Sequence, residues 1–91
     1  MSNTKYNTFT ATTSAQLIIV ANSRRKGFNL HNTSAVTCYW GFDSSVTTSN
    51  GFPLLTNGTH FNSGTSDGYR GDVYILAITG TADVRFQEWG Q

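Results

Sequence analysis

The stretch "AVTCYWGF", residues 35–42, carries the clearest strand signal in the chain. In an extended backbone, successive side chains point to opposite faces, so residues two apart share a face. One face of this stretch holds the apolar side chains of Val36, Cys38, Trp40 and Phe42. The pattern predicts a β-strand with one face packed against a core.

The same period of two recurs along the chain, whereas no window of a dozen residues has the apolar spacing of a helix. Two segments near the middle and the end, residues 28–32 and 83–89, each place two large apolar side chains on one face. The polar residues that alternate with them and are expected on the other face are Asn29, His31, Arg85 and Gln87.

Other extended segments are short and bounded by turn residues such as Gly, Asn and Asp. They are expected at residues 6–13, 15–21, 52–55 and 73–79. About seven or eight short strands at regular spacing are typical of a sandwich or a small barrel. We therefore predict an all-β fold, an antiparallel β-sandwich or jelly-roll-like barrel.

The composition bounds the size and class of the protein. The chain has 91 residues, which suits one domain. Only 12% of the residues are charged, against about 25% in an average globular chain. Thr, Ser, Asn and Gly replace them, which favours strands and turns. We assign residues 1–13 to an N-terminal arm or edge strand and residues 14–91 to a single β domain.

The uncharged stretch "VTTSNGFPLL", residues 46–55, is interpreted as a rigid loop. Asn50-Gly51 is the strongest turn signal in the chain, and Gly51 is expected to adopt a backbone conformation that most residues avoid. Pro53 lacks an amide donor, so its segment is expected at a sheet edge.

The residues give no sign of catalysis. The five acidic residues have no spacing that forces two carboxylates together, and no G-x-S-x-G motif is present. His31, His60 and Cys38 are fewer than the roughly four ligands of a structural zinc site. Cys38 shares the apolar face of its strand and is expected to be a buried thiol. We predict a non-enzymatic protein with no cofactor and no metal.

The net charge of +1 gives no electrostatic attraction to nucleic acid or to a membrane. The one basic cluster, "SRRKG", has two interpretations: a solvated hairpin turn, or a contact with an acidic strip on a partner. Its basic residues are Arg24, Arg25 and Lys26.

Large aromatic residues stand close to both ends of the chain, where a strand frays unless something covers it. They are Tyr6 and Phe9 near the start and Trp89 near the end. Two alternatives remain open: they pack on the body of their own chain, or they pack on a neighbouring subunit.

Three blocks together resemble a family of small virion proteins of tailed phages. They are "SAQLIIVANSRRKGFNLHNTS", "VTCYWGFDSSVTTSNGFPL" and "GYRGDVYILAITGTADVRFQEW", and they cover residues 14–89. The segment "NSGTSDG" is longer, and "RRK" more basic, than the pattern of that family. Small β-rich proteins of this kind resemble capsid decoration, or cement, proteins.

The resemblance implies a protein synthesised in the host cytoplasm that acts on the capsid surface of the virion. Its expected partner is the major capsid protein, which it would bind as a homotrimer on the outside of the assembled head. The residues expected in partner contacts are Tyr6, Phe9, Arg24, Arg25, Lys26 and Trp89. The alternative is a tail, baseplate or fibre module that binds host-surface carbohydrate, with Tyr69 and the preceding loop as the candidate site.

Overall fold

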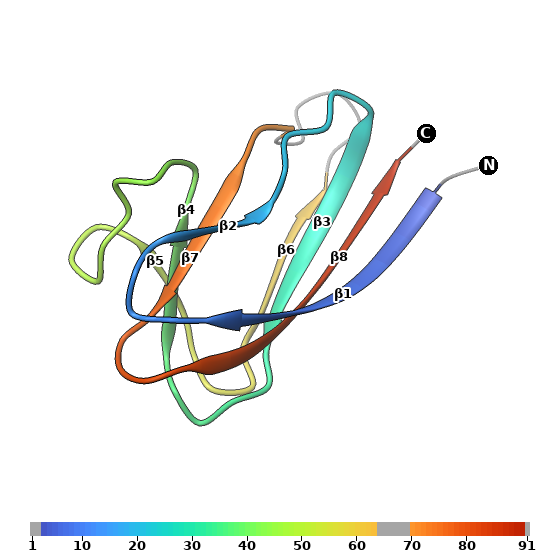
Figure 1. The fold of residues 1–91 in the computed structure, drawn as a ribbon. Coiled ribbons are helices and arrows are strands. Elements are labelled where there is room, and N and C mark those ends of the chain that lie inside the picture. The colour runs from blue at the N-terminus through green and yellow to red at the C-terminus, as the bar shows by residue number, and fades with distance from the viewer. Residues whose placement is uncertain (1–2, 64–69, 91) are drawn as a thin grey trace.

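The computed structural model describes residues 3–63 and 70–90, which form two four-stranded antiparallel sheets packed face to face (Figure 1). The described residues contain eight strands and no helix, so the predicted antiparallel β-sandwich is confirmed. The strands are β1 (Asn3–Ala11), β2 (Gln16–Ile19), β3 (Arg25–Asn32), β4 (Cys38–Gly41), β5 (Phe52–Leu54), β6 (Thr59–Ser63), β7 (Val73–Ala77) and β8 (Ala82–Gly90).

The strand orders are β1-β8-β3-β6 in one sheet and β2-β7-β4-β5 in the other. The first and last strands pair without a break, from Asn3 opposite Gly90 to Ala11 opposite Ala82. The two ends of the described chain therefore lie side by side (Figure 1). β1 is an edge strand, and Phe9 packs against the core cluster.

The core fills the space between the sheets. Phe28 and Leu30 of β3 are fully buried, as their alternation with polar residues predicts. Trp40 of β4 is 3% exposed, and its ring meets the ring of Phe28 edge to face at 6.2 Å between centroids. This arrangement suits the charge distribution of aromatic rings. The other buried members of the cluster are Ala11, Ile18, Ile19, Cys38, Leu54, Val73, Ile75, Ala77, Ala82 and Val84.

Asn32, at the end of β3, is a buried polar residue whose side-chain nitrogen and oxygen both form hydrogen bonds. Its Nδ2 donates to the carbonyls of Val36 at 2.6 Å and Leu54 at 3.0 Å. Its Oδ1 accepts from the backbone and side chain of Ser34. A buried amide must find such partners, and these bonds join β3 to the segments that begin β4 and end β5.

The loop between β4 and β5 is held by its own side chains. Val46 is buried and lies against Gly41 and Gly51. Asn50 Oδ1 accepts from the amide of Thr47 at 2.7 Å, and the Gly51 amide donates to the Thr47 carbonyl at 2.8 Å. Pro53 lies in the edge strand β5, as expected.

The reason we expected for glycine at position 51 is wrong. Among the described residues, the left-handed backbone region holds Asn57 and Gly80, both with φ of 58°. Gly51 is instead needed for space, since a Cβ there would lie 2.8 Å from Val46 Cγ2 and 2.9 Å from the Thr47 carbonyl oxygen. The packing of the loop on itself, and not the turn conformation, excludes a side chain.

Candidate functional site

Arg25, the first residue of β3, lies inside the sandwich with 0% exposure. Its Nε donates to Glu88 Oε1 at 3.1 Å. Its two terminal nitrogens donate to the backbone carbonyls of Gly71 at 3.1 Å and Val20 at 2.8 Å. Its guanidinium carbon is 5.5 Å from the centre of the Phe28 ring. One side chain thus connects β3 and β8 to the segments that end β2 and precede β7.

The expectation that the basic cluster forms one solvated turn or one partner contact is therefore wrong for Arg25. Arg25 points inward because the end of the sandwich offers it a carboxylate and two carbonyls, which a guanidinium satisfies with its several fixed donors. Arg24 and Lys26, its neighbours on either side, are exposed. Only these two remain available for a contact with another molecule.

The terminal aromatic residues differ in their surroundings. Phe9 is partly buried against the core, so it packs on its own chain. Trp89 is half-buried on β8. The backbone of Tyr6 pairs with Gln87, but its side chain lies outside the described residues, as does Tyr69. Of the expected contact residues whose side chains the structure describes, Arg25 is buried and Phe9 packs on the core, so these residues do not form one exposed surface.

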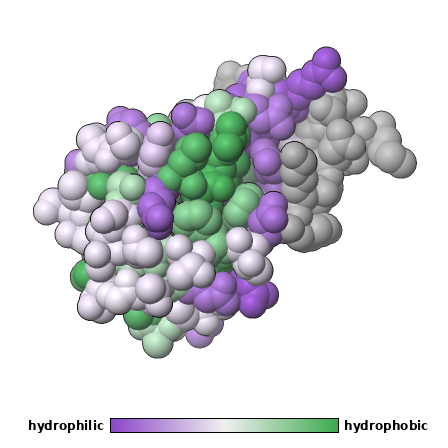
Figure 2. Space-filling model, in the orientation of Figure 1, coloured by the Kyte–Doolittle hydropathy of each residue, from purple (hydrophilic) through white to green (hydrophobic). Residues whose placement is uncertain are grey.

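Exposed large apolar side chains gather on the sheet β2-β7-β4-β5, a feature that the sequence analysis missed. Four of them directly follow a strand of this sheet. One of these is Phe42, which was predicted on the core-facing side of residues 35–42; that prediction is wrong, because β4 ends at Gly41 and Phe42 is 40% exposed. Figure 2 shows a hydrophobic patch in the region where Figure 1 draws β2 and β7. The residues are Leu17, Val20, Phe42, Phe52, Leu55 and Ile78, with exposed fractions between 39% and 64%.

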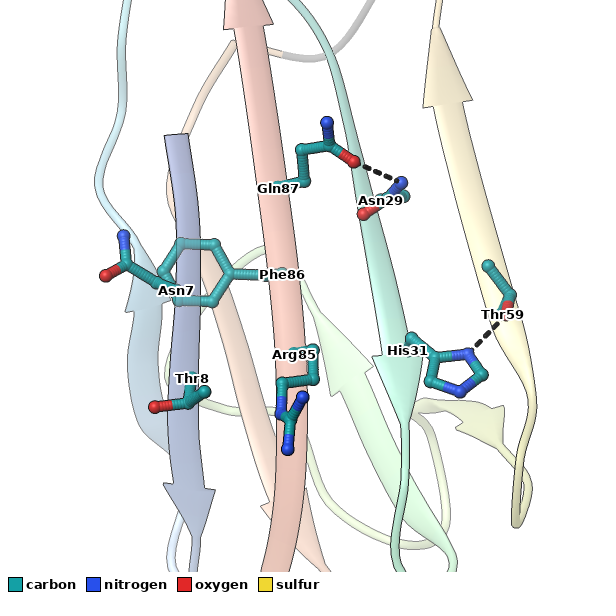
Figure 3. A pocket seen from close by; sticks show the side chains of 8 residues that line it. All are labelled: Asn7, Thr8, Asn29, His31, Thr59, Arg85, Phe86 and Gln87. Atoms are coloured by element: carbon teal, nitrogen blue, oxygen red, sulfur yellow. Dashed lines mark hydrogen bonds between the residues drawn. The ribbon is translucent and has the colours of Figure 1, made fainter. Parts of the chain in front are cut away.

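The opposite sheet carries a groove of about 630 Å³, lined mainly by polar side chains from its outer face (Figure 3). One row of residues crosses all four strands in register, Thr8, Arg85, His31 and Thr59. His31 Nδ1 and Thr59 Oγ1 share a hydrogen bond of 2.5 Å. Arg85 donates to Asp83 at 3.3 Å, and both side chains are about half exposed.

The next row of the groove pairs two amide side chains. Asn29 Nδ2 donates to Gln87 Oε1 at 3.1 Å, from β3 to β8 (Figure 3). Asn7 of β1 and Phe86 of β8 complete the lining. The sequence placed Asn29, His31, Arg85 and Gln87 on outward faces, and this is confirmed. The antiparallel order β8-β3, which brings them together, was not predictable from their separation along the chain.

The described residues contain no group of three or more His, Cys, Asp or Glu side chains that could hold a metal ion. They also contain no helix long and apolar enough to cross a membrane. Burial raises the pKa of the Cys38 thiol to about 11, which makes it a poor nucleophile at neutral pH because the thiolate is the reactive form. Hydrogen bonds from the side chain and backbone of Ser45 lower the pKa of the exposed carboxyl of Asp43.

Comparison with known proteins identifies the fold and no family. No protein-family model and no curated protein sequence matches the chain. One solved structure is similar over 100% of this chain and 87% of its own, with a TM-score of 0.52 and 16% sequence identity. It comes from work on Bacillus endospore appendages, described as a novel family of disulfide-linked pili. At this identity the likeness concerns the fold alone and agrees with a β-sandwich.

Proposed function

We propose that the protein is a non-enzymatic structural protein of a phage virion, a decoration protein that binds the outer surface of the assembled head. In this proposal its partner is the major capsid protein, and it acts as a homotrimer. Binding to the assembled shell but not to its free subunits would stabilise the shell by mass action. The resemblance of residues 14–89 to small virion proteins motivates the choice of a phage.

The observation that carries the proposal is the uneven distribution of apolar side chains between the two sheets. Among the side chains that the structure describes, the six large apolar ones that are exposed all belong to β2-β7-β4-β5 or directly follow one of its strands. The groove on the other sheet is lined mostly by amides, hydroxyls and charged groups. Exposed apolar side chains concentrated on one side of a domain mark an interaction site. We infer that the protein docks through β2-β7-β4-β5 and turns its polar sheet outward.

The chemistry of Cys38 determines how such a contact forms. The chain has one cysteine, and its thiol is buried with 0% exposure. A disulfide between subunits, the linkage named for the structurally similar pili, would require this thiol to reach the surface. We therefore propose that assembly is non-covalent and relies on apolar contacts between weakly charged surfaces.

Fractionation of the virion tests the location. Heads and tails of the phage that encodes the chain are separated, and each is analysed by mass spectrometry for peptides of this protein. The proposal predicts the peptides in the head fraction, at a copy number comparable to the positions available on the shell. Peptides found with tails alone would overturn it and favour the tail or fibre module.

Light scattering after size exclusion tests the oligomeric state. The proposal predicts a particle of three 10.0 kDa chains that persists on dilution. A particle of one chain at every concentration would contradict the trimer, though single copies could still decorate the head. The fractionation tests the location alone and the light scattering tests the oligomeric state alone, so each part of the proposal can fail by itself.

A further inference from the structure

The polar groove on the outer face of β1-β8-β3-β6 is left free by docking through the opposite sheet. We propose that this groove binds a neutral oligosaccharide chain, with Trp89 stacking against one sugar ring beside the groove. The inference concerns a different surface from the proposed docking sheet, so either can fail without the other.

The size and shape of the groove suit a short stretch of sugar chain. Its volume of about 630 Å³ lies within the range of roughly 300–1,000 Å³ typical of ligand sites. The row of Thr8, Arg85, His31 and Thr59 runs across the strands. A ligand lying along this row would meet side chains from four successive strands, which are fixed by the sheet and not by a loop.

The lining contains both hydrogen-bond donors and acceptors, which the hydroxyl groups of a sugar require. The amides of Asn29 and Gln87 each offer both a donor and an acceptor, as do the hydroxyls of Thr8 and Thr59. Sugar hydroxyls also donate and accept, so each can pair with either kind of group. No carboxylate is among the described lining residues.

Two of the contacts within the groove prepare it for a ligand. Asn29 and Gln87 are joined at 3.1 Å, and His31 and Thr59 at 2.5 Å. Side chains that are already held lose less rotamer freedom on binding. The Asn29–Gln87 pair also keeps unused donors and acceptors, because each amide has two N–H groups and two acceptor sites.

Trp89 offers an aromatic surface beside the groove, on the side of β8 that Arg85 and Gln87 share. β8 pairs with β1 without a bulge, so residues two apart in β8 share a face. Arg85, Gln87 and Trp89 therefore lie on the same face of the sheet. Trp89 lies opposite Gly27 of β3, one row beyond the pair Gln87 and Asn29. A half-buried indole beside hydrogen-bonding amides presents an apolar face and a polar edge, which matches the apolar face and hydroxyl rim of a pyranose ring.

An anionic ligand fits the same residues less well. The basic residues in the described lining are Arg85 and His31. Arg85 already contacts Asp83 and is 56% exposed, and the His31 ring is committed to Thr59. Recognition of phosphate or sulfate relies on clustered Arg and Lys donors, and the described lining contains no such cluster. The density of amides therefore favours a neutral ligand.

Nuclear magnetic resonance of the two indole N–H groups tests the proposal with an internal control. The protein is titrated with neutral hexasaccharides of glucose, mannose, galactose and N-acetylglucosamine, and separately with inorganic phosphate and a sulfated hexasaccharide. We expect at least one neutral sugar to shift the Trp89 indole and the Asn29 and Gln87 amides saturably. The Trp40 indole, 3% exposed in the core, should not move.

Variants then locate the site. N29A combined with Q87A should weaken binding by at least about tenfold, because several hydrogen bonds are lost at once. S44A combined with T48A, which removes two exposed hydroxyls from the β4–β5 loop, should leave the affinity unchanged. The proposal is overturned if no neutral hexasaccharide shifts Trp89, if the N29A/Q87A protein binds as tightly as wild type, or if only the phosphate or sulfated probe binds.

Discussion

Arg25 and Glu88 form a buried ion pair, with Nε and Oε1 3.1 Å apart, at the end of the sandwich where four segments meet. The arginine is fully buried and the glutamate side chain is 14% exposed. A charge in such a place must be paired and hydrogen-bonded to be tolerated. Arg25 also donates to the carbonyls of Val20 and Gly71, which flank strands of the other sheet, so it links the two layers.

Removal of Arg25 should therefore destabilise the fold strongly. We expect R25A to lower the free energy of unfolding by about 3–5 kcal/mol, because Glu88 and two carbonyls lose their partner. R24A, one residue away and exposed, should change it by less than about 0.5 kcal/mol. Urea denaturation of both variants measures the difference, and equal effects would show that Arg25 does not act as the internal link described here.

Gly51 and Gly80 should respond differently to substitution because they are glycines for different reasons. A Cβ at Gly51 meets the Thr47 carbonyl and Val46, whereas a Cβ at Gly80 meets nothing within 4 Å but φ is 58°. G80N should cost little, since Asn tolerates the left-handed region, while G51N should cost about 1–3 kcal/mol through overpacking. Thermal unfolding compares the two. A greater loss for G80N than for G51N would refute the steric explanation.

Asn32 should not tolerate replacement by its acidic isostere. N32D keeps the shape but removes both N–H donors, so an acceptor would face the Val36 and Leu54 carbonyls in a fully buried position. We expect a loss of at least about 3 kcal/mol at pH 7. The effect should diminish at low pH, where the carboxyl protonates and can donate once. A variant as stable as wild type at pH 7 would contradict the hydrogen bonding assigned to Asn32.

The buried Cys38 thiol should make stability fall at alkaline pH. Its pKa rises from 9.0 to about 11 on folding, so its contribution is complete below about pH 9 and is lost as the pH approaches 11. At most about 3 kcal/mol is involved, at 1.36 kcal/mol for each unit. Denaturation of wild type and C38A from pH 8 to pH 11 should give curves that converge. Curves that stay parallel would mean that the thiol does not titrate differently on folding.

The sequence predicted the sandwich and the faces of its central strands because period-two alternation depends only on local geometry. Phe28, Leu30 and Trp40 are in the core for that reason. The burial of Arg25 was missed, since its partners Glu88 and the Gly71 carbonyl are 63 and 46 residues away. A charged residue is expected to be exposed unless the fold brings a partner of opposite charge and hydrogen-bond acceptors to it from distant parts of the chain.

The two candidate surfaces were also beyond local reasoning. Val20, Leu55 and Ile78 each follow a strand, and only the order β2-β7-β4-β5 places them on one sheet. Likewise, Asn29 and Gln87 meet because β3 pairs with β8. Their outward direction was predictable from alternation, whereas their juxtaposition depends on a pairing that links distant segments.

Sedimentation of the protein with assembled phage heads, the partner that we propose, tests the docking most directly. A variant with V20S, L55S and I78S removes three apolar side chains that are at least half exposed, and S44A, T48A and T81A is the matched control at exposed positions. Wild type and control should pellet with the heads, and the V20S/L55S/I78S variant, though folded, should remain in the supernatant. Failure of wild type to pellet, or equal pelleting of all three proteins, would contradict docking through β2-β7-β4-β5.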